Sequence, residues 1–219
     1  MDVKHFVHHR RRLFHYTSPH GVDRLRHHGL WPAEELLARY GTAPDRIAEL
    51  TTFPRFDPVP LDHPDHGPAR LSHQRPTLTT RQPLKKLLRS LELGDTTLSE
   101  FCQMLARRVF LFPTAYVPGR KSRPAYGFVE RVLHDGPLCE VALRTDDLLQ
   151  LCAEHGLQLE LSAHNAGSAP QGLVLPKGRN TWKRIEDFHL GVDRIQEVVV
   201  EGSLPPLDGV IDEVRHVRR

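Results

Sequence analysis

The sequence has 219 residues, of which 39% are hydrophobic and 26% charged, and its formal net charge is +3. These values are typical of a folded globular protein and exclude a fibrous chain or one that is disordered throughout. No apolar run approaches the roughly 20 residues that cross a bilayer. The basic start of the chain lacks the apolar segment of a secretory signal. We therefore expect a cytoplasmic protein without membrane association, with Cys102, Cys139 and Cys152 as reduced core thiols.

The positive charge is unevenly distributed. Residues 1–28 hold six Lys and Arg against two Asp, together with seven of the fifteen histidines. Further basic clusters fall at 120–123 and 177–184. Such clusters are either a solvated surface or the binding surface of an anionic partner, such as a dinucleotide or nucleic acid. We interpret residues 1–12 as a basic arm that precedes a single domain over 13–219.

The first part of the chain predicts a strand followed by helices. Residues 12–17 are β-prone, and Ser18-Pro19 has the pattern of an N-cap with proline at the first helical position. The following helix ends at Gly29, and a second is predicted over 32–40. Residues 51–83 carry seven of the eighteen prolines and show no apolar period, so we expect a loop that covers a cleft or contacts a substrate.

The remainder of the chain mixes helices and strands. Thr97-Leu-Ser-Glu100 is a capping box, which predicts a helix through Ala106. Residues 127–133 and 210–217 are ambiguous between helix and strand. The other predicted elements are helices over 84–93, 145–155 and 182–188 and strands over 108–112, 138–144, 157–161 and 195–200. This order predicts a single α+β domain.

The sequence contains none of the common catalytic or nucleotide-binding motifs GxGxxG, Walker loop, GxSxG and HExxH. The closely spaced His63 and His66, and His5, His8 and His9, invite a metal site. They lie in a proline-rich loop and a basic segment without a carboxylate or cysteine framework, so we assign no metal ligands. A metal-dependent nuclease that uses the loop histidines remains an alternative function.

Two polar residues occupy unexpected places. His15 lies at the end of a strand directly before a capped helix, where side chains and backbone N–H groups can meet an anion. Glu197 lies inside Ile195-Gln-Glu-Val-Val-Val200, a run that predicts a buried strand. The alternatives are a histidine satisfied by the strand–helix turn and an edge strand with a solvated face. The functional interpretation is that both side chains point into one cleft.

These positions carry a resemblance to a known family. Leu13-Phe-His-Tyr-Thr17, then Val22-Asp-Arg-Leu25 and His28-Gly-Leu30, resembles the opening of DarT-type ADP-ribosyltransferases and, more closely, an uncharacterised bacterial domain family related to them. Ile195-Gln-Glu-Val-Val199, followed by Leu204-Pro-Pro-Leu207, is similar to their closing strand. Residues 81–84, 108–112 and 164–168 are similar to further family segments, so the resemblance spans 13–217 in order.

The resemblance implies a split central β-sheet flanked by helices and NAD as the substrate. Glu197 would be the catalytic carboxylate, as in DarT-type enzymes. His15 would hold the adenosine ribose with Tyr16 or Thr17 beside it. Arg81 or Arg108 would neutralise the pyrophosphate, and Asn165 would shape the nicotinamide side. Candidates for an aromatic residue stacked on nicotinamide are Tyr116, Tyr126 and Phe128.

Two functions follow from the resemblance. The first is an NAD-dependent ADP-ribosyltransferase that releases nicotinamide, with nucleic acid, such as single-stranded DNA, as its acceptor. The alternative is a catalytically silent nucleotide- or nucleic-acid-binding module of the same fold. If Glu197 faces a cleft opposite His15, the enzyme is favoured; if it faces solvent, the binding module is favoured.

Overall fold

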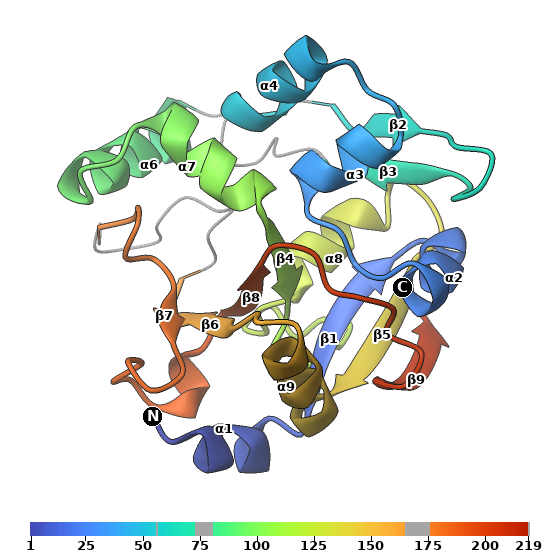
Figure 1. Ribbon diagram of the computed structural model, residues 1–219. Coiled ribbons are helices and arrows are strands. Elements are labelled where there is room, and N and C mark those ends of the chain that lie inside the picture. The colour runs from blue at the N-terminus through green and yellow to red at the C-terminus, as the bar shows by residue number, and fades with distance from the viewer. Residues whose placement is uncertain (56, 73–80, 165–175, 219) are drawn as a thin grey trace.

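The computed structural model describes residues 1–218 apart from 56, 73–80 and 165–175, with the backbone alone for 81–84. The described residues form a mixed α+β fold with antiparallel sheets (Figure 1). The α-helices are α1 (Val3–His9), α2 (Pro19–His27), α3 (Ala33–Arg39), α4 (Pro44–Thr52), α6 (Arg81–Leu93), α7 (Leu98–Ala106), α8 (Tyr126–Val132) and α9 (Thr145–Glu154). The strands are β1 (Arg12–Thr17), β2 (Val59–Leu61), β3 (Ala69–Leu71), β4 (Arg108–Leu111), β5 (Cys139–Arg144), β6 (Leu159–Ser162), β7 (Lys183–Arg184), β8 (Glu197–Glu201) and β9 (Ile211–His216).

Two antiparallel sheets form the centre of the fold. One has the order β1-β5-β9 and the other the order β4-β8-β6-β7. Their edge strands meet where Phe14 pairs with Phe112, through N···O hydrogen bonds of 2.9 and 2.8 Å. Beyond this pair the two sheets diverge, and β2 and β3 form a separate hairpin. Because β1 and β4 belong to different sheets, their ends can frame a cavity.

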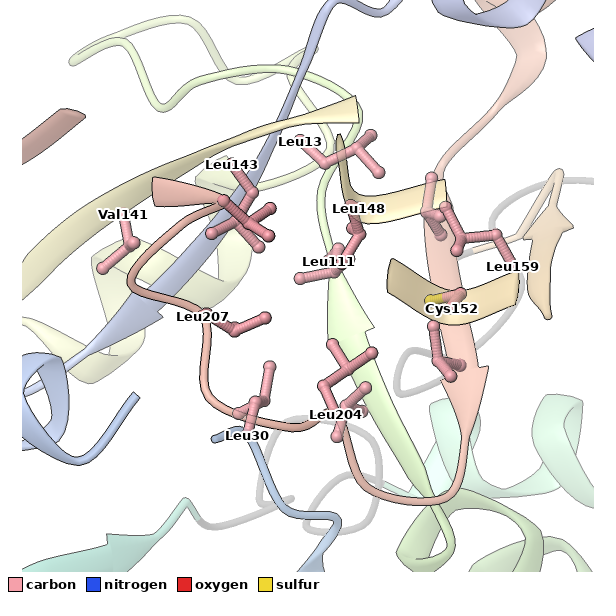
Figure 2. Packing of buried hydrophobic residues seen from close by; sticks show 14 of the residues in the cluster. Leu13, Leu30, Leu111, Val141, Leu143, Leu148, Cys152, Leu159, Leu204 and Leu207 are labelled. Atoms are coloured by element: carbon pink, nitrogen blue, oxygen red, sulfur yellow. The ribbon is translucent and has the colours of Figure 1, made fainter. Parts of the chain in front are cut away.

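The main core lies between the sheets and α9. Figure 2 shows Leu13 and Leu143 from the first sheet beside Leu111 and Leu159 from the second, with Leu148 of α9 among them. Val198, Val199 and Val200 are fully buried, because β8 lies between β4 and β6 with helices and the core on its faces. The apolar run in the sequence is therefore explained by a central strand.

Most predicted elements agree with the structure. The Thr97–Glu100 capping box is present, and Ser18 accepts a hydrogen bond from the backbone N of Gly21 at 3.2 Å. The two ambiguous segments are resolved as helix α8 and strand β9. None of the helices in the described residues has the length and apolarity that crossing a bilayer requires.

Three predictions need correction or refinement. The helix predicted over 182–188 is wrong, because Lys183 and Arg184 pair with β6 as strand β7 and turns follow. Most of the predicted N-terminal arm is helix α1, whose Phe6 is fully buried in the main core. The proline-rich segment 51–83 contains the β2–β3 hairpin and the start of α6. In these segments tertiary packing decides the structure over local propensity.

Candidate functional site

A cavity of about 560 Å³ opens where the two sheets diverge. Its walls are formed by the end of β1, the start of α2, Trp31, the β2–β3 hairpin, α7, β4, α8 and Glu197. This volume lies within the range of cavities that hold a drug-sized ligand. The proline-rich segment contributes Arg55 and residues 68–72 to the walls, which agrees with its expected place at a cleft.

The structure brings His15 and Glu197, far apart in the sequence, to the walls of this one cavity. His15 comes from β1 of one sheet and Glu197 from β8 of the other. Glu197 is 4% exposed, and β8 is a central strand. The alternative of an edge strand with Glu197 on a solvated face is therefore wrong. A carboxylate at this position is directed at whatever occupies the cavity.

His15 is held in a defined chemical state. Its Nδ1 lies 3.1 Å from the carbonyl oxygen of Phe110. The pKa of His15 is lowered to about 4, mainly by burial. The hydrogen bond to Phe110 acts in the opposite direction and raises the pKa, whereas the positive charge of Arg24 lowers it. The ring is therefore neutral at physiological pH. Because a carbonyl can only accept, Nδ1 carries the proton and Nε2 is a hydrogen-bond acceptor.

This state of His15 predicts acid-sensitive stability. The folded-state pKa lies below the unfolded value of 6.5, so the unfolded chain takes up a proton first. Stability should therefore fall as the pH falls from 6.5 to 4, by about 3 kcal/mol in total. Urea unfolding of wild type and His15→Gln across this range measures the difference. His189→Gln, which changes an exposed histidine, should retain the wild-type slope; a His15→Gln variant that does so too would contradict the prediction.

The cavity is rich in positive charge. Its charged lining consists of arginines from five places in the fold and two carboxylates: Arg24, Arg55, Arg70, Arg108, Arg131, Asp135 and Glu197. Burial lowers the pKa of Arg55 and that of Arg131, although arginine stays protonated. The excess of guanidinium groups in a partly enclosed space attracts an anionic ligand.

Of the two arginines that the sequence suggests, Arg108 lines the cavity and already contacts other groups. The Arg108 guanidinium lies 4.5 Å from the Trp182 ring centre and pairs with Glu201, and its Nε lies 3.5 Å from Glu160. Its charge is thus already compensated. Arg81 belongs to α6, but its side chain lies outside the described residues, as does the whole of Asn165.

Arg24 and Arg55 are site residues that the sequence reasoning missed. Arg24 lies on α2, donates to the hydroxyl of Tyr40 at 3.3 Å and acts electrostatically on His15. Arg55 donates to the carbonyls of Leu50 and Ser72 at 2.9 and 3.3 Å. Arg24 could have been suspected because it lies on the helix that directly follows the strand–helix junction. No pattern in the sequence singles out Arg55, since it lies in the proline-rich segment.

The two residues after His15 differ in what they can do. The Tyr16 hydroxyl donates to Glu140 Oε2 at 2.6 Å and accepts from the Tyr116 backbone N at 2.7 Å. Burial and Glu140 raise the pKa of Tyr16 far above its usual value. Tyr16 therefore contributes its ring to the cavity while its hydroxyl is bound elsewhere. Thr17 also lines the cavity, and its side chain packs against Gly21, where a Cβ would lie 1.9 Å from Thr17 Oγ1.

Replacing Tyr16 should therefore affect stability more than ligand binding. Tyr16→Phe removes a hydrogen bond to a buried carboxylate, which costs about 2 kcal/mol of unfolding free energy. The ring keeps its place, so the affinity of the cavity for a ligand should stay within a factor of two or so. Urea unfolding and ligand titration separate the two effects. A variant of normal stability with lost ligand binding would place the hydroxyl in the site after all.

One of the three aromatic candidates reaches the cavity. Phe128 lines it, with its ring centre 5.6 Å from that of Phe112. Tyr116 instead donates to Glu130 and stacks on Tyr126 with ring centres 6.1 Å apart. Phe128 is therefore the aromatic candidate whose ring can contact a ligand from the α8 side.

Two segments that are part of the resemblance, residues 25–30 and 204–207, are in contact. The backbone N of Leu30 donates to the Leu204 carbonyl at 3.1 Å, and Leu204 N donates to Leu30 at 2.9 Å. Leu207 N donates to the carbonyl of Leu25 at 3.0 Å. These hydrogen bonds hold the chain after β8 against the end of α2. The start of the same helix borders the cavity.

The loop histidines form an aromatic cluster. The His66 ring centre lies 4.6 Å from that of His63 and 4.8 Å from that of His28, with Trp31 at 5.1 Å. Within the described parts of the chain, no group of three His, Cys, Asp or Glu side chains is arranged to hold a metal ion. The described residues therefore give no support to the nuclease alternative.

Comparison with known proteins assigns a family but no activity. Comparison with curated proteins finds no match. A model of a family of unknown function, DUF7002, matches residues 11–211, which include the residues around the cavity and both sheets except for β9 beyond Ile211. The chain therefore belongs to DUF7002.

Proposed function

We propose that this protein is an NAD-dependent ADP-ribosyltransferase of the DarT-like kind, with Glu197 as its catalytic carboxylate and nucleic acid as its acceptor. The observation that carries the proposal is the meeting of His15 and Glu197 at one cavity between two sheets. The resemblance assigns these two residues to NAD, and the presence of two sheets whose edges meet at the Phe14–Phe112 pair is compatible with the divided sheet that it implies. Nothing in the family description argues for or against it.

The charge and size of the cavity suit a dinucleotide. NAD carries two phosphate charges, and Arg24 and Arg55 both line the cavity, where their guanidinium groups also donate to the Tyr40 hydroxyl and to the backbone carbonyls of Leu50 and Ser72. The start of α2 adds the partial positive charge of a helix N-terminus. His15 Nε2 can accept a hydrogen bond from a ribose hydroxyl, and Phe128 and Trp31 offer flat apolar faces to the bases.

Glu197 would then act on the bond that breaks. Loss of nicotinamide from NAD proceeds through an oxocarbenium-like ribose, as in glycoside hydrolysis. A buried carboxylate that accepts a hydrogen bond from the 2′-hydroxyl of this ribose stabilises the developing positive charge. The electron pair of the glycosidic bond leaves with nicotinamide, and the ribose carbon then bonds to a nucleophilic atom of the acceptor, which loses a proton.

The same cavity could serve a catalytically silent binding module. Glu197 argues for the enzyme, because a buried carboxylate opposes binding of an anionic dinucleotide unless it has a use in the reaction. In a site built only for binding, an apolar residue on β8 would raise affinity without the cost of a buried charge.

Labelled NAD tests the proposal. The full chain is incubated with NAD labelled in its nicotinamide ring or in its adenosine, together with single-stranded DNA, single-stranded RNA or protein. We expect release of free nicotinamide and transfer of the adenosine label to nucleic acid. Binding of NAD without nicotinamide release would favour the silent module. A wild-type protein that neither binds nor consumes NAD would overturn both forms of the proposal.

A further inference from the structure

Arg131 of α8 differs from the other arginines of the cavity in what its side chain contacts. It lines the cavity, and its Nε is buried without a hydrogen-bond partner in the protein. Among the residues that the structure describes, no hydrogen bond and no carboxylate ion pair engages its guanidinium. Buried polar groups in folded proteins nearly always have a partner. A buried donor at a cavity wall that has none is therefore a candidate contact for a ligand.

The other four arginines on the described walls of the cavity donate hydrogen bonds within the protein. Arg24 donates to a tyrosine hydroxyl, and Arg55 donates to two backbone carbonyls. Arg70 donates to a backbone carbonyl at 2.6 Å. Arg108 donates to a backbone carbonyl at 3.0 Å and also to a carboxylate. Arg131 can therefore bind an anion without giving up or sharing an existing hydrogen bond, whereas each of these four arginines already uses part of its guanidinium.

The carboxylates that are near Arg131 in the sequence have other partners. Glu130 accepts a hydrogen bond from the hydroxyl of Tyr116. Oδ2 of Asp135 lies 4.0 Å from a guanidinium nitrogen of Arg70, on the hairpin across the cavity. Burial lowers the pKa of Arg131, and the charge of Asp135 raises it against that effect, although the two side chains form no ion pair. Two guanidinium groups thus accompany one carboxylate here, and the excess charge is positive.

Helix α8 holds the guanidinium of Arg131 at the cavity wall. Phe128 precedes Arg131 by three positions, so the two side chains lie on the same side of the helix, and both line the cavity. The guanidinium carbon lies 5.8 Å from the ring centre of Phe128, which is a cation–π distance. Val129 and Val132 anchor the helix in a buried cluster with Phe112. The cation is therefore supported by a ring and a packed helix before any ligand binds, which lowers the cost of binding.

We propose that Arg131 binds the pyrophosphate of the ligand, through N–H groups in the plane of its guanidinium. The planar fork of an arginine matches two oxygens of a phosphate group, and such charge-assisted contacts are among the strongest hydrogen bonds in proteins. That the ligand is NAD rests on the proposed function, whereas the binding of a phosphate-type anion at Arg131 does not. The resemblance gives this role to Arg81 or Arg108 and gives none to Arg131.

Calorimetric titration with inorganic pyrophosphate and with NAD tests the inference. The titrations are made at low salt, where electrostatic contacts are strongest. Arg131→Met should weaken the binding of both ligands by about 10- to 100-fold, the usual effect of losing hydrogen bonds to a charged group. Arg131→Lys keeps the charge but loses the fork, so it should restore the affinity only in part. The matched control Arg123→Met removes an exposed arginine outside the cavity walls and should bind as wild type.

Thermal unfolding distinguishes a binding role of Arg131 from a structural one. Without ligand, Arg131→Met should melt at the wild-type temperature or above it, because the change removes a buried cation without a hydrogen-bond partner. The rise in melting temperature that pyrophosphate causes in the wild type should be lost in this variant. If Arg131 served only to support α8 through Phe128, the variant would melt at a lower temperature and keep its affinity.

The two ligands separate this inference from the proposed function. A wild type that does not bind pyrophosphate at low salt would overturn the inference, as would an Arg131→Met variant with wild-type affinity for pyrophosphate and NAD. If the wild type binds pyrophosphate through Arg131 but does not bind NAD, the proposed function fails and the anion site stands. If Arg131→Met binds and consumes NAD as the wild type does, the inference fails and the proposed function stands.

Discussion

Glu197→Gln should slow NAD turnover by about 100- to 1,000-fold, the usual effect of losing one preorganised electrostatic contact in a transition state. Glutamine has nearly the same shape, so the packing of β8 should survive. The affinity for NAD should change little, because the lost charge matters most when the ribose becomes positive. The stability cost should be modest, because glutamine keeps the volume of the side chain within the buried strand.

The experiment needs three measurements on the same preparations: nicotinamide release, NAD binding and melting temperature. Glu213→Gln is a matched control, because Glu213 is an exposed strand glutamate on β9, paired with Arg12 at 3.2 Å. It should retain wild-type turnover. A Glu197→Gln variant that keeps full turnover would show that Glu197 is not the catalytic carboxylate, whereas a wild type that binds NAD without turnover would leave the binding module as the remaining interpretation.

Gly29→Ala should destabilise the protein by about 3 kcal/mol or more. Gly29 has a φ of +92°, and a Cβ there would lie 2.1 Å from the Leu204 carbonyl oxygen. That oxygen accepts the hydrogen bond from Leu30. An alanine must therefore break the contact that fastens the chain after β8 to the end of α2, in addition to the strain of the left-handed backbone.

Gly41 provides the matched comparison. Its φ is +70°, and a Cβ there would meet no atom within 4 Å. Gly41→Ala should therefore cost only about 1 kcal/mol, from the backbone strain alone. Urea unfolding of both variants separates the cost of backbone strain from the cost of the steric contact with Leu204. Equal losses for the two variants would show that the Leu30–Leu204 contact contributes little to stability.

Elements with a local cause could be predicted from the sequence. Ser18-Pro19 and Thr97–Glu100 determine helix starts through hydrogen bonds to residues three positions on, and the structure contains them. The helix that the sequence predicts over 182–188 is wrong. The structure of this segment depends instead on pairing of Lys183 with Leu161 of β6, a partner that the local sequence cannot reveal.

The candidate site was predictable in part for the same reason. His15 and Glu197 stand out because each is polar within a β-prone run, which is a local anomaly. Arg55 has no such anomaly, and its place depends on how the proline-rich segment folds back onto Leu50 and Ser72.

The Phe14–Phe112 pair joins the two central sheets along one edge. Within each sheet the strands are held by a ladder of backbone hydrogen bonds, whereas the joint has the two backbone hydrogen bonds of this pair and the hydrogen bond of 3.1 Å from His15 Nδ1 to the carbonyl of Phe110 in β4. His15 belongs to one sheet and Glu197 to the other. A ligand that touches both residues therefore adds a bridge between the two sheets at the cavity.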